Sequence, residues 1–122
     1  MYKVINIGEE QVAFLAKAST NLYFKEVFHQ DPIALQSDEN AGNAERIDFT
    51  QKLAFIMSKQ AEAQDAVTSG KVNSIRDFMQ KVTEDDFFDW LDRFDFMDLQ
   101  DALAETMGVY TANHVSTSKA KK

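Results

Sequence analysis

Hydrophobic positions over the first 18 residues predict a β-hairpin. The segments "YKVINI" (2–7) and "VAFLAKA" (12–18) are rich in Val, Ile and Phe, which favour strands. The short polar stretch between them contains Gly8, a residue typical of tight turns. Because a lone hairpin is only marginally stable in water, we expect it to pack on the rest of the chain.

A helix is predicted after the hairpin, where apolar residues begin to recur three and four positions apart. Ser19 or Thr20 is placed to cap its N-terminus, and Pro32 is expected to stop it soon after its end. The apolar side of this helix consists of Tyr23, Phe24, Val27 and Phe28. The polar residues 35–45, which include Gly42, then predict the main loop.

A long helix is predicted over residues 44–66. One stripe at helical spacing contains Phe49, Leu53, Ile56, Met57, Gln60 and Val67. Phe55 lies on the far side of this stripe, and two interpretations stay open: it packs against the hairpin, or it forms part of a partner surface. Gly70 is expected to end the helical region, and Ser74 then begins a short helix, with Asp77 as its capping-box partner.

Acidic and large apolar residues alternate almost one for one between Thr83 and Glu105. Thr83 and Asp86 have capping-box spacing and predict the start of a helix. With a rotation of about 100° per residue, the large apolar residues that follow fall on one arc of this helix. That arc contains Phe87, Phe88, Trp90, Leu91 and Phe94. A second stripe, about half a turn away, contains Phe96, Leu99, Leu103, Met107 and Tyr110. Since one straight helix cannot bury both stripes in one core, we predict a break at 93–95, with Asp95 capping a second helix to about Ala112.

The pattern as a whole predicts a mainly α (α+β) domain of about five helices with an N-terminal β-hairpin. A single domain is expected over residues 1–113, a length that can bury an ordinary core. The last residues, 114–122, lack apolar periodicity and are expected to form a flexible tail.

Charge is concentrated in one part of the chain. The 122 residues carry a net charge of −7, and residues 84–105 contain nine carboxylates and one arginine, a net of −8. The remainder therefore sums to about +1. A near-neutral domain with one strongly acidic element is not expected to bind nucleic acid there, because phosphates repel carboxylates.

Residue types and spacings favour a non-catalytic protein without cofactor or metal. There is no cysteine, and the two histidines, His29 and His114, lie far apart without zinc-site spacing. The carboxylates do not follow the calcium-loop pattern, and no Gly-rich phosphate loop is present. No apolar run approaches the roughly 20 residues that span a bilayer, and the N-terminus lacks a signal-peptide pattern. We therefore expect a cytoplasmic protein without a membrane partner.

The function must therefore be inferred from residues that could lie on the surface. The large apolar residues of the acidic stretch are too many for a small bundle to bury easily. Either all of them are core, or some form an exposed patch ringed by aspartates that binds another protein. The candidate partner-binding residues are Phe55, Phe88, Trp90, Phe96 and Met97.

Three segments, in order along the chain, resemble tail assembly chaperones of long-tailed bacteriophages and prophages. They are "AKASTNLYFKEVFHQDPI" (16–33), "FTQKLAFIMSKQA" (49–61) and "FFDWLDRFDFMDLQDAL" (87–103). The matching positions of the first segment are Ala16, Ala18, Thr20, Tyr23, Phe28, Asp31 and Ile33. Two positions depart from the family pattern: His29 stands where glycine is usual, and Asn21 stands where proline is usual.

The resemblance implies a helper protein of the host cytoplasm that is absent from the mature virion. Such chaperones coat the tape-measure protein, keep it soluble and help recruit the major tail protein, in many cases through a longer, frameshifted form. Self-association into a homo-oligomer is compatible with this role. Two alternatives stay open: a structural head–tail component retained in the virion, and an acidic inhibitor that mimics DNA.

Overall fold

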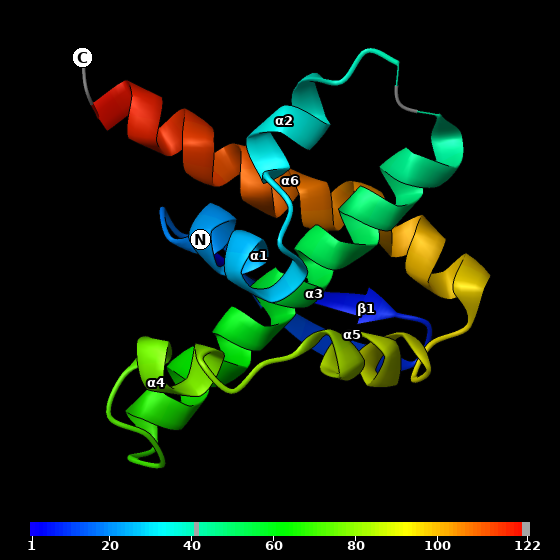
Figure 1. Cartoon of the computed structure of the whole chain (residues 1–122). Helices are drawn as coiled ribbons and strands as arrows, with labels where there is room; N and C mark the ends of the chain where they lie inside the picture. The colour runs from blue at the N-terminus through cyan, green and yellow to red at the C-terminus, as the bar shows by residue number, and fades with distance from the viewer. Residues whose placement is uncertain (41, 121–122) are drawn as a thin grey trace.

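The computed structural model describes residues 1–40 and 42–120, and within them a two-stranded hairpin is followed by six helices (Figure 1). The elements are β1 (Tyr2–Ile7), β2 (Glu10–Leu15), α1 (Thr20–Phe28), α2 (Pro32–Ser37), α3 (Asn43–Thr68), α4 (Ile75–Met79), α5 (Glu84–Leu91) and α6 (Phe96–Ala120). The predicted fold class, mainly helical with an N-terminal hairpin, is confirmed.

The hairpin is antiparallel, with Tyr2 opposite Leu15 and Ile7 opposite Glu10. Gly8 occupies the turn at φ +62°, a left-handed conformation that favours glycine. A side chain there would also be crowded, because a Cβ would lie 2.6 Å from Asp98 Oδ2 of α6. The inward residues of both strands are buried against α3 and α6, so the hairpin packs on the helices as predicted.

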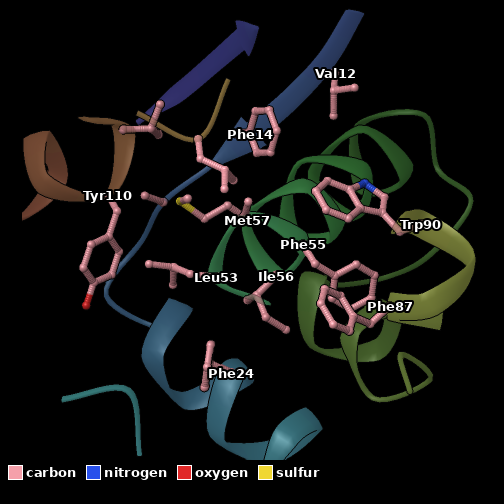
Figure 2. Close-up of a cluster of buried hydrophobic side chains, with 14 of the residues drawn as sticks. Val12, Phe14, Phe24, Leu53, Phe55, Ile56, Met57, Phe87, Trp90 and Tyr110 are labelled. Carbon is pink, nitrogen blue, oxygen red and sulfur yellow. The ribbon is translucent and has the colours of Figure 1, made fainter. Parts of the chain in front are cut away.

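Helix α3 is the centre of the molecule (Figures 1 and 2). It contacts β2, α1, α4, α5 and α6, and every residue from Leu53 to Ser58 is buried. A helix buried all round has more than one apolar stripe, so the single predicted stripe was incomplete. Val67, assigned to that stripe, is only half-buried because it lies near the end of α3.

A buried polar cluster joins the start of α1 to α3. The Thr20 hydroxyl donates to Gln60 Oε1 at 2.7 Å, and Gln60 Nε2 donates to Ser19 Oγ at 3.4 Å. Ser19 occupies the N-cap position, but its side chain makes no capping bond. The predicted N-cap position at Ser19 is confirmed, but the side-chain capping bond is missing because the Ser19 hydroxyl instead accepts from the amide of Gln60, a residue that is 0% exposed.

Helix α2 replaces part of the predicted loop over residues 35–45. Pro32 is the first residue of this helix, and Asp31 caps it by accepting a hydrogen bond from the Ile33 backbone N–H at 3.0 Å. Proline suits this position because the first helical N–H has no partner within the helix. The chain thus uses Pro32 to begin a second helix, whereas the sequence pattern was read only as a stop to the first.

The last helix is longer than predicted. Its backbone is helical to Ala120, whereas the predicted end was near Ala112. The flexibility predicted for residues 114–122 stays a prediction, and residues 121–122 lie outside the described part of the chain.

The end of α1 gives a test of backbone strain. His29 has φ +56° and ψ +34°, and its N–H donates to the Lys25 carbonyl at 2.9 Å. We expect His29→Gly to raise the free energy of unfolding by about 1 kcal/mol, because glycine adopts this conformation without the Cβ penalty. Urea denaturation measures the change. The control Lys25→Gly, inside the same helix, should lower stability by a similar amount; a loss of stability in His29→Gly would contradict the strain argument.

Candidate partner-binding surface

Phe55, one of the five candidate partner-binding residues, is a core residue. Its side chain is 0% exposed, and its ring centroid lies 5.4 Å from that of Phe87, 5.8 Å from Trp90 and 6.1 Å from Phe28 (Figure 2). The surrounding rings come from α1 and α5, which cover this side of α3. The assignment of Phe55 to a partner surface was therefore wrong.

Trp90 is also buried, at 2% exposure, and its assignment to a partner surface was wrong for the same reason. Its ring packs at 5.0 Å against Phe94 as well as against Phe55. The indole Nε1 has no hydrogen-bond partner, so Trp90 is held by packing alone. This position on α5 faces α3, together with Phe87.

Phe88 lies on the same helix but is 60% exposed. Consecutive residues of a helix are about 100° apart, so Phe88 falls at the margin of the arc whose centre, near Phe87, faces the core. Burial of the predicted arc is thus incomplete: Phe87 and Trp90 are buried, while Leu91 and Phe94 are half-buried. Phe88 is accessible to a partner.

Phe96 and Met97 are 57% and 59% exposed in the first turn of α6. The buried face of α6 begins only at Leu99. Asp98, the residue after Met97, lies against Gly8 in the hairpin turn. The prediction that Phe96 belongs to the buried stripe was wrong, because nothing in the described chain covers it there.

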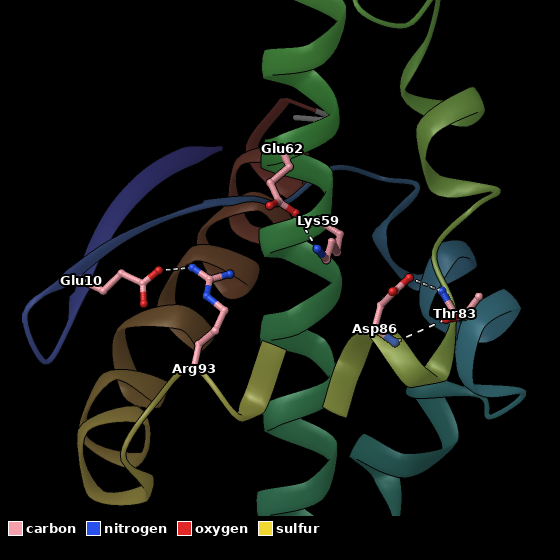
Figure 3. Close-up of polar contacts among 6 residues, drawn as sticks. All are labelled: Glu10, Lys59, Glu62, Thr83, Asp86 and Arg93. Atoms are coloured by element: carbon pink, nitrogen blue, oxygen red, sulfur yellow. Dashed lines mark hydrogen bonds and ion pairs between the residues drawn. The ribbon is translucent and has the colours of Figure 1, made fainter. Parts of the chain in front are cut away.

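The start and end of α5 follow the predicted pattern. Thr83 and Asp86 form a capping box: the Thr83 N–H donates to Asp86 Oδ2 at 2.9 Å, and the Asp86 N–H donates to Thr83 Oγ1 at 3.4 Å (Figure 3). After the helix, Asp95 Oδ1 accepts from the Met97 N–H at 2.8 Å. The predicted break before Asp95 is confirmed, and it lets α5 and α6 face the core in different directions.

Arg93, in the segment between α5 and α6, forms an ion pair with the hairpin. Its guanidinium pairs with the Glu10 carboxylate of β2 (Figure 3) and lies 5.2 Å from the Phe94 ring centroid. The one cation of residues 84–105 is therefore already paired within the chain.

We call residues 84–98 the acidic–apolar segment. It contains the exposed Phe88, Phe96 and Met97, and most of its carboxylates are exposed. Those exposed carboxylates are Glu84, Asp85, Asp89, Asp92, Asp95 and Asp98. The arrangement combines accessible apolar area with a strongly negative surrounding, which suits protein binding and disfavours contact with phosphates.

Two groups with a shifted pKa lie outside this segment. The pKa of Tyr2 is raised by partial burial and by the Asp65 carboxylate, to which its hydroxyl donates at 3.3 Å. The pKa of Arg76 is raised by its hydrogen bond to Glu26. Both are structural pairs between distant parts of the chain, since each links residues 50 or more positions apart.

No group of three or more His, Cys, Asp or Glu side chains is arranged to hold a metal ion within residues 1–40 and 42–120. A search of the same ranges finds no helix with the length and apolar content to cross a membrane.

A second candidate site was missed by the sequence analysis. Two neighbouring cavities, each of about 330 Å³, lie where α2, α3 and α6 meet. The first is lined by Leu35, Gln36, Asp38, Glu45, Arg46, Phe49, Thr50 and Met107, and the second by Arg46, Ile47, Thr50, Gln100, Leu103, Ala104 and Met107. Residues 35–45 were predicted to form a loop, so a cavity lined by α2 was not expected.

Comparison with known proteins adds no relative. No family model matches the chain, no curated protein matches it, and no solved structure matches it.

Trp90 offers a test of the division between core and surface. Trp90→Phe should cost about 1 kcal/mol or less, because the indole N–H that is lost has no partner, whereas Trp90→Ala should cost about 3–5 kcal/mol. By contrast, Phe88→Ala should change stability by less than about 1 kcal/mol, since Phe88 is mostly exposed. Chemical denaturation measures all three, and equal costs for the two alanine variants would contradict the assignment.

Proposed function

We propose that this chain is a non-catalytic chaperone of phage tail assembly, which binds the tape-measure protein and keeps it soluble. The observation that carries the proposal is the exposure of three large apolar side chains, Phe88, Phe96 and Met97, within the most acidic part of the chain. Single exposed apolar residues are ordinary, but three that fall within residues 88–97, surrounded by carboxylates, are typical of a protein-binding surface.

The sequence resemblance supports the same role. Its three segments fall on α1 with the start of α2, on α3, and on α5 with the start of α6, and α3 packs against α1, α5 and α6. The position at which the family has glycine is His29, the one non-glycine residue of the described chain with a positive φ. This agreement is what a helix end built for glycine would produce.

The acidic–apolar segment suits a client that must later be released. Each copy offers a small apolar contact, so binding by one copy is weak and reversible. Several copies along one long client gain affinity through avidity without new contacts. The surrounding carboxylates keep such complexes apart, because like charges oppose aggregation.

In this proposal the protein acts in the cytoplasm of the bacterial host and is absent from the finished virion. The major tail protein would be recruited afterwards, through a longer frameshifted form. Mass spectrometry of purified phage particles separates the proposal from its main competitor, since a structural head–tail component would be retained in stoichiometric amount.

Co-expression with the tape-measure protein tests the proposal directly. The intact chain should raise the soluble yield of tape-measure protein several-fold, and the double variant Phe96→Ser/Met97→Ser should lose most of that gain, because it removes exposed apolar area. Leu22→Ser is the matched control: Leu22 is 64% exposed on α1, outside the acidic–apolar segment, and its loss should leave the yield unchanged.

Circular dichroism establishes that all variants are folded before yields are compared. An unchanged yield with the intact chain would contradict the proposed function. An equal loss of soluble yield with Leu22→Ser would show that binding is not specific to residues 84–98.

A further inference from the structure

We propose that the two cavities between α2, α3 and α6 form one groove that binds an amphipathic helix of the partner. We call it the α3–α6 groove. The inference rests on the proposed function in one respect, that the partner is a helical client. The cavities share Arg46, Thr50 and Met107, so they adjoin each other.

The groove is built from apolar residues at its floor. Phe49 and Leu103 are buried, at 8% and 4% exposure, and Leu35 and Met107 pack against the same core. A volume of about 330 Å³ in each cavity accommodates one or two large side chains. Two such spaces in a row fit the apolar anchors of a helix, which recur every three or four residues.

The charges at the first cavity indicate the sign of the partner. Asp38 and Glu45 line it together with Arg46, so carboxylates outnumber cations there. A helix with Lys or Arg beside its apolar anchors is complementary to this opening, whereas an acidic helix is repelled.

Two synthetic helical peptides of about 18 residues, or five turns, test the inference. Both carry Leu for the first cavity and a second Leu four residues later for the second, and they differ only in having Lys or Glu at the polar positions. Each is titrated into ¹⁵N-labelled protein at about 0.15 M salt, where exposed charges are screened beyond about 8 Å. We expect the Lys peptide to bind at least tenfold more tightly and to shift the signals of Thr50, Met107 and the Gln100 side-chain amide.

Ala104→Leu adds side-chain volume at the second cavity and should weaken binding of the Lys peptide at least tenfold. Ala44→Leu makes the same change at an exposed site of α3 outside both cavities and should leave the affinity unchanged. Both substitutions introduce a good helix former, so thermal unfolding followed by circular dichroism should show both variants folded.

Three outcomes would overturn the groove: no binding of either peptide, equal loss with both leucine variants, or shifts confined to Phe88, Phe96 and their neighbours. The last would place a basic helix on the acidic–apolar segment. Failure here is distinct from failure of the proposed function, because the co-expression assay requires only that the client be kept soluble. If the Lys peptide binds the groove but the protein has no effect on the soluble yield of tape-measure protein, the groove is supported and the tape-measure protein is rejected as its partner.

Discussion

Burial of α3 on every side is the constraint on which the rest of the molecule depends. Leu53 to Ser58 are six consecutive buried residues, so no face of this part of the helix tolerates water. The hairpin, α1, α5 and α6 each cover a different side of it. The cover is aromatic on one side, where the rings of Phe28, Phe87 and Trp90 surround Phe55. Removing any one of these elements would expose part of the helix.

The same constraint explains the unusual acidic stretch. Helix α5 must direct Phe87 and Trp90 inward to cover Phe55, while α6 must direct Leu99 and Leu103 toward its own neighbours. A break between them is required because the two inward directions differ. The carboxylates then occupy the remaining outer positions, where they stay hydrated. The few apolar residues that neither helix buries are left among them.

Two surfaces of different character are available for a partner. The acidic–apolar segment has exposed apolar side chains among carboxylates, whereas the α3–α6 groove has buried apolar residues, Phe49 and Leu103, in its lining. In a chaperone the two would complement each other. A groove selects a helical segment by the size and polarity of its anchors, and an acidic exterior keeps neighbouring copies from aggregating.

Local patterns were enough to determine the hairpin, the capping box at Thr83 and the break before Asp95, because turns and helix caps depend on residues only a few positions apart. Sequence periodicity also indicated the helical parts of the chain other than α2. It could not determine which apolar residues of an arc are covered, since that depends on neighbours distant in the chain: Phe55 and Trp90 proved buried, and Phe88, Phe96 and Met97 exposed. The groove could not be predicted without knowing that α2 forms and lies beside α3 and α6. Only the tertiary structure decided these points, because burial is a property of the packed elements together and not of any one of them.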